Sequence, residues 1–358
     1  MAYFTVHREL VDPDYYDGVV ASKREDLQFQ TVVGRLKGKQ PLDWEQKVQV
    51  AAFPKAYDAA VAEGVDFDKT TIGAGDQDFV LSHVMEIFRS KGYRVTRHRQ
   101  AMPGHNDKKG MTAAQKKVKD AQDLLLSVEI AALSDQELTP YGTTKKPIMR
   151  GAFNWLQKSA HSALDIDAKL RPTAGYEDDV NKLTEELFKA ECIKAKKQRG
   201  TGNMSLVGMV GIDLKGIMSG WLGAASNINT GKLMRTQDAD KKTLQLICDD
   251  FVFDGVRVHV LNDDHVNIPM SGEGAFNPSG ASYLSGIFID PTMWGFSTLM
   301  PLEHFDIKDE GAGPGGWHET TLRLTCLNPM GQFRVNHVVS SGETGSSETG
   351  DGETGDGE

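Results

Sequence analysis

The sequence predicts an α+β protein in which two long helices are followed by a β-rich remainder. Apolar residues recur at helical spacing between 113 and 199, whereas strand-like alternation predominates from Thr243 onward. Long polar segments without a core pattern precede and interrupt these elements. Because helices come early and strands late, a repeated βαβ arrangement is not expected.

The chain is acidic and is long enough for about two domains. It has 358 residues and a formal net charge of −10, and residues 340–358 alone hold six acidic side chains, which leaves −4 for the rest. A free nucleic-acid-binding protein would present a basic surface instead. Cys192, Cys248 and Cys326 lie far apart, so neither a disulfide framework nor a cysteine zinc site is expected, and a reducing compartment fits.

Neither a secretory signal nor a membrane span is predicted. The N-terminal residues lack an apolar run. The most apolar window, Leu206–Ala225, carries Asp213 and Lys215 at its centre, and each would cost about 2.5–3.5 kcal/mol in a bilayer core. We interpret the window as a buried strand, Ser205–Ile212, followed by a short helix that begins at Asp213 and ends at Trp221.

Two strands with a long segment between them predict a projecting β-arm. Trp44 and Val48 lie on the apolar face of an alternating strand, and a second strand-like run spans Val80–Val95. The intervening Ala51–Phe79 has no core pattern, and so long a loop is usually functional. Isolated two-stranded ribbons are marginal in water. The arm, like the polar residues 1–40, therefore needs a surface outside itself.

Two amphipathic helices are predicted. The first spans about Ala113–Ser134 behind a T-x-x-Q capping box that begins at Thr112. Its apolar stripe consists of Val118, Ala121, Leu125, Val128 and Ala132. The second spans about Asp179–Arg199 and stops at Gly200, with acids at its start and bases at its end. Its stripe consists of Val180, Leu183, Leu187 and Ala190.

The C-terminal third predicts strands and then a disordered tail. Val256, Val258 and Val260 alternate after Asp254-Gly255, which is a hairpin signal. Further alternation ends at Cys326. Residues 340–358 repeat G-E-T-G and contain no apolar side chain, so burial cannot offset the entropy of ordering them.

No catalytic, cofactor or metal site is predicted. The sequence lacks the nucleophile-elbow, zinc-protease and Walker A motifs. We interpret the glycine-rich Glu310–Trp317 as an inter-strand loop and Asp263, Asp264 and His265 as a solvated turn. His304 and His318 have no evident acid or nucleophile nearby in sequence, so they are expected to be structural histidines.

The order of elements resembles the major capsid proteins of tailed bacteriophages, whose fold is named after the phage Hong Kong 97. The stretches that carry the resemblance are Pro41–Val50, Val61–Phe67, His83–Val95, Gln115–Ser134, Gly151–Leu156, Leu183–Ala190 and Trp317–Asn328. The resemblance implies an N-terminal arm (1–40), an E-loop (41–97), a P-domain with a spine helix (98–150), an A-domain (151–290) and returning P-domain strands (291–339). The resemblance covers about Leu27–Val335, so the tail, 340–358, and most of the N-terminal arm lie outside it.

The implied function is a shell subunit that forms hexamers and pentamers of an icosahedral head around double-stranded DNA. The resemblance implies no cofactor, non-specific DNA contact, scaffolding and portal partners, room for a decoration protein, assembly in the host cytoplasm and a place in the virion. The expected subunit contacts are Trp44, Val48, Lys55, Tyr57, Phe67, Phe79 and Phe88. Two alternatives stay open: an encapsulin-like compartment, and a two-domain cytosolic enzyme that uses His304, His318 or the Asp263–His265 turn.

Overall fold

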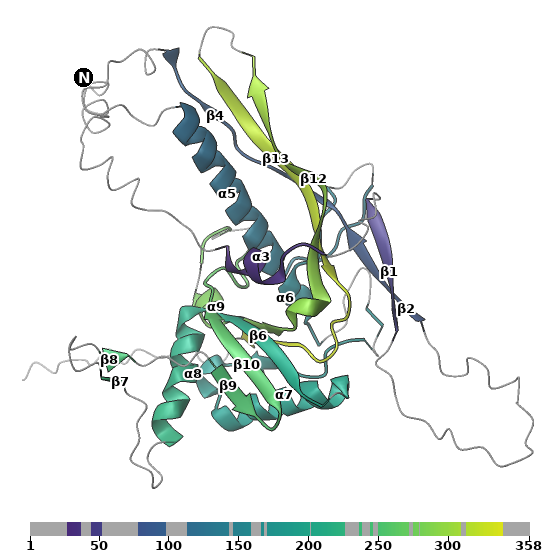
Figure 1. Cartoon of the computed structure of the whole chain (residues 1–358), viewed down its shortest axis with the longest axis vertical. Helices are drawn as coiled ribbons and strands as arrows, with labels where there is room; N and C mark the ends of the chain where they lie inside the picture. The colour runs from purple at the N-terminus through teal and green to yellow at the C-terminus, as the bar shows by residue number, and fades with distance from the viewer. Residues whose placement is uncertain are drawn as a thin grey trace, which may run out of the picture.

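The computed structural model describes residues 27–36, 44–51, 78–97, 113–142, 146–158, 166–167, 170–200, 202–225, 236–237, 244–245, 250–271, 275–278, 280–308 and 313–338. These residues form an elongated molecule (Figure 1). One end holds a long helix beside a β-hairpin, and the other holds a mixed sheet with its helices. The expected α+β class is confirmed.

A six-stranded sheet organises the lower part of Figure 1. Its order is β5 (Tyr176–Asp178), β14 (Phe333–His337), β11 (Gly286–Ile289), β6 (Met204–Val210), β10 (Val256–Asn262) and β9 (Asp250–Phe253). The β6–β10 and β5–β14 pairs are parallel, and the other pairs are antiparallel. On one face, α7 (Glu185–Arg199) and α8 (Ile212–Ala225) pack into a shared apolar cluster around Phe188.

The β9–β10 hairpin predicted at Asp254-Gly255 is confirmed. Asp254 has φ 43° and Gly255 has φ 82°, and a two-residue turn of this type requires positive φ at both positions. Shorter elements complete this part of the molecule. They are α6 (Ala152–Trp155), α9 (Gly280–Tyr283), 3₁₀ turns at Val180–Lys182 and Pro291–Met293, and the separate pair β7 (Thr236–Gln237) and β8 (Leu244–Gln245).

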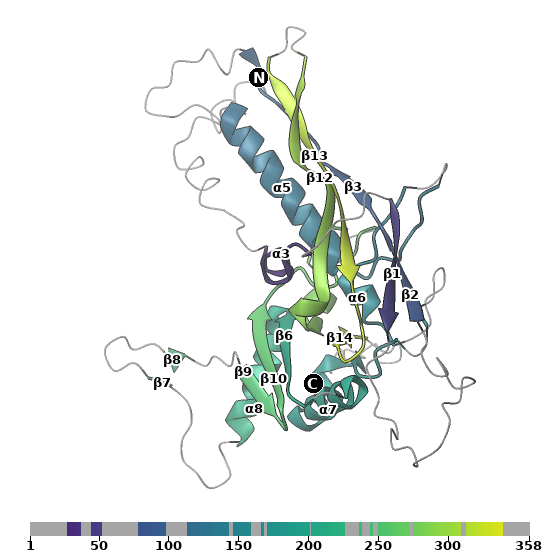
Figure 2. The ribbon, with the colours of Figure 1, turned by 45° about the vertical axis from the view of Figure 1, so that its right-hand side comes forward.

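A long helix and a long hairpin form the upper part. Helix α5 (Ala113–Leu133) runs beside β12 (Trp294–Ile307) and β13 (Gly315–Cys326) in both ribbon views (Figures 1 and 2). Strands β3 (Glu86–Arg89) and β4 (Tyr93–Arg94) pair with β13. The short helix α3 (Gln28–Val33) contacts both α5 and β12. Buried side chains from α3, α5, β3, β12 and β13, together with Met209 and Ile287 of the lower sheet, belong to one core that joins the two parts.

The expected β-arm is a two-stranded ribbon of β1 (Glu45–Ala51) and β2 (Asp78–Val84). The strands pair antiparallel from Glu45↔Val84 to Ala51↔Asp78, so residues 52–77 leave from one end of the ribbon. The ribbon stands to the side of the main body (Figure 2). The second predicted run, Val80–Val95, is divided among β2, β3 and β4, because β3 and β4 leave the ribbon to join β13.

The predicted apolar stripe of α5 needs correction. Val128 and Ala132 are fully buried, but Val118 is 58% exposed, and Leu124 rather than Leu125 is buried, at 3% exposure. The buried line includes Asp120, whose carboxylate is bonded inside the protein. Hydrophobicity alone points to Val118, whereas the packing partners β13 and β4 select the line through Asp120 and Leu124.

The second predicted helix begins later than expected and buries another face. Helix α7 starts at Glu185 because the Thr184 Oγ1 accepts a hydrogen bond from the Leu187 N–H at 3.3 Å. Leu187 is 45% exposed and Ala190 is also exposed, whereas Phe188 and Cys192 are buried. Two further differences are small: the strand expected over Ser205–Ile212 is β6, and the helix after it continues to Ala225.

Candidate assembly surfaces

The root of the ribbon is fixed to the body by stacking and hydrogen bonds. Trp44 stacks on Tyr141 with ring centroids 5.3 Å apart. The Tyr141 N–H donates to the Glu45 Oε1 at 3.0 Å, and the Met85 N–H donates to the Trp44 carbonyl at 2.9 Å. Gln46 accepts a hydrogen bond from the guanidinium of Arg323, a fully buried residue of β13. The ribbon therefore leaves the body in a defined direction.

A buried histidine sits beneath this root. The His83 Nε2 lies 3.1 Å from both the N–H and the carbonyl of Cys326, and its Nδ1 lies 3.2 Å from the Leu81 carbonyl, so backbone groups contact both ring nitrogens. The ring stacks on Trp155 at 5.1 Å. Burial, together with the positive charge of Arg323, lowers the pKa of His83 to about 4. His83 is thus a neutral structural residue near pH 7.

A buried carboxylate links β3, just after the ribbon, to the chain that follows α5. Glu86 is 1% exposed and accepts from the Lys146 Nζ at 2.9 Å, the Met149 N–H at 3.2 Å and the Gln136 Nε2 at 3.3 Å. Burial raises the pKa of Glu86, and these donors act in the opposite sense. Three donors on one carboxylate hold β3 against the segment after α5.

The outward part of the ribbon is more exposed than its root. Val80 is 54% exposed, whereas Val48 is partly buried against the core. Of the expected subunit contacts, Trp44 is half-buried against Tyr141, and Phe88 is only 7% exposed, so it packs in the core and offers no surface. Lys55, Tyr57, Phe67 and the side chain of Phe79 lie outside the described residues.

The outer half of the β12–β13 hairpin carries exposed apolar side chains. Leu302, Phe305 and Ile307 are 39%, 36% and 39% exposed, and Phe305 stacks on Trp317 of β13 at 5.6 Å. Apolar side chains that stay solvated along a projecting element are typical of a contact with another molecule.

Two groups of hydrogen bonds join the β12–β13 hairpin to α5, to Ser90 and to β4. The His318 Nδ1 lies 2.9 Å from the Asp120 Oδ2, and the Ser90 hydroxyl donates to the same oxygen at 2.5 Å. The Tyr93 hydroxyl lies 3.0 Å from the His304 Nε2, and the two imidazole centroids are 4.8 Å apart. Burial and the charge of Lys117 lower the pKa of His304.

The candidate catalytic residues have structural roles. Ser90 and His318 both bond to the Asp120 carboxylate, so the aspartate lies between the serine and the histidine. In a catalytic triad the histidine lies between the other two, so this imidazole is not placed to take the serine proton. In the predicted solvated turn, Asp263 is instead buried and bonds the N–H and Nδ1 of His265, while the Asp264 Oδ1 accepts from the Ile212 N–H at the start of α8. The described ranges contain no group of three or more His, Cys, Asp or Glu side chains that could hold a metal ion.

Several charged side chains beneath these surfaces are buried, and no local sequence pattern predicts their burial. Arg334 is 3% exposed and donates to Glu177, Asp135 and the Phe153 carbonyl at 2.9–3.0 Å. Glu129 is fully buried on α5 and accepts from the backbone of α3. Charged residues are rarely buried without partners, and these partners come from distant parts of the chain, so the sequence does not reveal them.

The comparisons with known proteins agree with this geometry. The chain matches the family described as SU10 major capsid protein over residues 2–336. It is similar in structure to the capsid protein of the cyanophage P-SCSP1u, with a TM-score of 0.52, 11% sequence identity and 86% of each chain covered. It is also similar to a capsid chain of a native GTA particle, with a TM-score of 0.50, 8% identity and coverage of 89% and 92%.

No curated protein sequence matches the chain significantly. The described helices include none that is long and apolar enough to cross a bilayer. The family match covers almost the whole chain, and it decides between the open alternatives in favour of a structural shell protein, not an enzyme. The chain belongs to the SU10 major capsid protein family and is a self-assembling subunit of a bacteriophage head shell, located in the virion.

Proposed function

We propose that copies of this subunit join into the hexamers and pentamers of an icosahedral head chiefly through the β1–β2 ribbon and the residues 52–77 that it carries. The observation behind this proposal is the contrast along the ribbon. Its root is held by Trp44, Glu45 and Gln46, whereas Val80 is 54% exposed. A two-stranded ribbon is marginal alone, so its outer part gains stability by lying on another copy.

The outer half of the β12–β13 hairpin is a second contact in this proposal. Its support is the exposed apolar set Leu302, Phe305 and Ile307, on a hairpin that α5 braces along its length. Shell stability then comes from the sum of several such contacts per subunit, each of modest area.

The expected domain layout of arm, E-loop, P-domain and A-domain is part of the same proposal. Its partners are further copies of the chain, a portal protein, a scaffolding protein and a decoration protein, and assembly takes place in the host cytoplasm. Packaged double-stranded DNA is contacted non-specifically. The near-neutral charge of the chain outside residues 340–358 supports weak DNA contact, because tight non-specific binding needs many Lys and Arg side chains on one face.

Deletion of residues 52–77 tests the ribbon proposal. Ala51 and Asp78 are register partners, so a two-residue Gly-Ser turn can close the ribbon without moving its strands. We expect a soluble subunit with unchanged circular dichroism that forms no shells in negative-stain electron microscopy. A matched control removes residues 340–358, and this chain is expected to form shells. Normal particles from the 52–77 deletion would overturn the proposal.

A further inference from the structure

Four basic side chains gather on one flank of α5 near its first residues, and this basic flank consists of Lys91, Arg94, Lys116 and Lys119. Lys116 and Lys119 are three residues apart, so they lie about 60° apart around the helix and about 4.5 Å apart along it. The Lys116 Nζ donates to the Arg94 carbonyl at 3.1 Å, which places β4 beside this part of α5. The Ser90 hydroxyl bonds to Asp120, so the segment that contains Lys91 runs along the same side.

The basic flank lacks the acidic partners that basic side chains have elsewhere in the protein. All of its members except Lys116 are exposed, and these three form no salt bridge in the part of the chain that the structure describes. Asp120, the acid beside them, is buried and already bonded inside the protein. Around α7, by contrast, Lys182, Lys189 and Lys194 each pair with a carboxylate at 2.6–3.7 Å. The flank therefore presents a local excess of positive charge.

The position of these charges on α5 opposes the preferences of a helix. Basic side chains stabilise the C-terminal end of a helix and are unfavourable at its positive N-terminal end. Helix α5 has no acidic residue in its first turn, whereas Lys116, Lys117 and Lys119 lie in its first two turns. Like charges at this spacing also repel each other. Departures from local preference of this kind are expected at functional surfaces, and a bound anion would relieve the repulsion.

We propose that the basic flank binds the phosphate backbone of double-stranded DNA packaged in the head. This surface rests on the proposed function, in which packaged DNA is contacted non-specifically. The exposed neighbours Gln115 and Gln122 on α5 are polar, whereas the centre of a protein–protein interface is depleted of lysine and rich in apolar side chains. Duplex DNA carries one negative charge per about 1.7 Å of its axis, so it presents several phosphates to the four cations.

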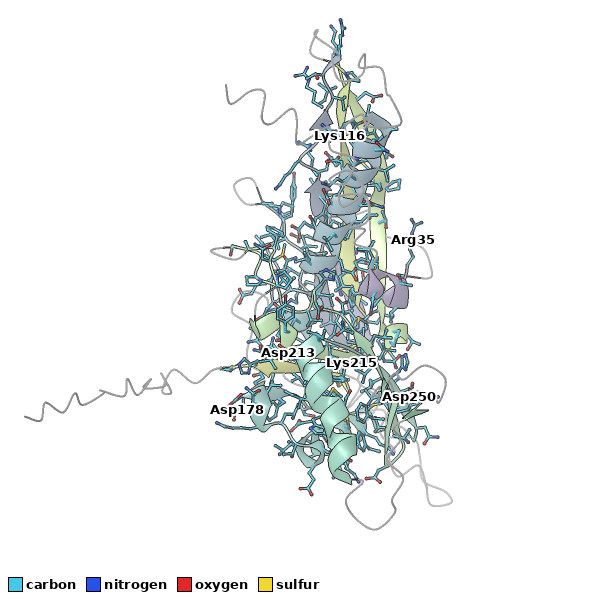
Figure 3. All side chains as sticks on the ribbon, turned by 90° about the vertical axis from the view of Figure 1, so that its left-hand side faces the viewer. Arg35, Lys116, Asp178, Asp213, Lys215 and Asp250 are labelled. Carbon is cyan, nitrogen blue, oxygen red and sulfur yellow. The ribbon has the colours of Figure 1, made fainter. Side chains whose placement is uncertain are left out.

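The distribution of charge over the molecule favours this end for DNA. Lys116 lies at the end of α5 away from the lower sheet, whereas Asp178, Asp213 and Asp250 lie on that sheet and on α8 (Figure 3). Carboxylates repel phosphate, so the lower part is the less favourable surface. Each phosphate contact contributes about 0.9 to the slope of log affinity against log salt, so four contacts give binding that stays weak at physiological salt.

Duplex binding by the unassembled, full-length chain tests this surface. Lys91→Gln combined with Lys119→Gln removes two exposed charges and leaves the Lys116 contact intact. By fluorescence anisotropy with a labelled duplex of about 20 base pairs, we expect the Kd at about 50 mM salt to rise at least tenfold and the salt slope to fall by about 1.8. Lys182→Gln combined with Lys197→Gln is the matched control, because it removes the same charge around α7, and it should change the Kd less than twofold.

Equal losses in the two double variants, an unchanged Kd in the first, or no binding by the natural chain would overturn the proposal. Negative-stain microscopy of the first variant separates this surface from the shell proposal. Normal shells with unchanged DNA affinity would refute the DNA surface and leave the shell proposal intact. Lost shells with unchanged DNA affinity would show that the flank contacts another protein, which also overturns the DNA contact.

Lysine acetylation of the natural chain provides a second measurement that needs no substitution. A bound phosphate backbone shields the amines that it contacts. With duplex added, we expect acetylation of Lys91, Lys116 and Lys119 to slow at least threefold, as measured by peptide mass spectrometry. Lys197 is exposed on α7 and should react at the same rate with and without DNA. Equal protection of Lys197, or none on the basic flank, would contradict the proposed contact.

Discussion

The burial of Leu124 provides the most direct test of how α5 packs. Its side chain is 3% exposed in the core that α5 shares with the β12–β13 hairpin. Leu124→Ala removes the equivalent of three methylene groups, which at about 0.8 kcal/mol each amounts to about 2.4 kcal/mol of lost transfer free energy. The cavity left behind adds to this, so we expect the free energy of unfolding to fall by about 3–5 kcal/mol.

Leu187→Ala is the matched control, because it removes the same atoms from the surface of α7. Leu187 is 45% exposed, so about half of the transfer term applies and no closed cavity forms. The expected loss is about 1 kcal/mol. Urea unfolding followed by circular dichroism, at subunit concentrations below those that form shells, measures both variants. Equal losses would mean that α5 does not pack through the line that contains Leu124.

Three further predictions follow from the ribbon root, a helix cap and the C-terminal segment. The pKa of His83 is about 4 in the folded chain against an ordinary 6.5, so its contribution to the free energy of unfolding is complete above pH 6.5 and is lost as pH falls toward 4, by about 3 kcal/mol at most. His83→Gln should therefore flatten the plot of unfolding free energy against pH between these values. The same plot for His83→Gln as for the natural chain would refute this role of His83. Thr184→Ala should lower the free energy of unfolding by about 1 kcal/mol, measured in urea, because the Leu187 N–H loses its acceptor. Thr184→Ser keeps a hydroxyl and should retain most of this stability, so equal losses in the two variants would argue against the cap. A chain that ends at Val339 should form particles of normal appearance by negative-stain microscopy, because residues 340–358 contain no apolar side chain to bury, and loss of shells on this truncation would show that the segment makes an ordered contact.

Local sequence rules were sufficient where one short stretch determines the geometry. Asp254-Gly255 was identified as a two-residue hairpin because both positions need positive φ, and the structure places both there. The span of α5 was within one residue of the prediction, and Gly200 ends α7 in the left-handed conformation expected of a C-terminal glycine. The ordered series of such elements also sufficed to indicate the capsid family.

The choice of helix face could not be made in the same way. On α5, Val118 and Leu125 looked more apolar than Asp120, yet Asp120 is buried, since Ser90 and His318 supply its hydrogen bonds. On α7, the cap at Thr184 shifts the start of the helix, and the surrounding phenylalanines select Phe188 over Leu187. A periodic pattern shows that a helix has an apolar side, but the neighbouring elements decide which line is covered.

Sequence alone therefore determined the span of α5, the Asp254-Gly255 turn, the glycine that ends α7, and the kind of protein to which these elements belong. Those features depend on backbone preferences and on residues close together in the chain. Only the tertiary structure decided which charges are buried, because Glu86, Glu129 and Arg334 are stabilised by partners from distant segments. It also decided that one end of α5 stays covered and the other exposed, because α3 reaches Glu129 but not Val118.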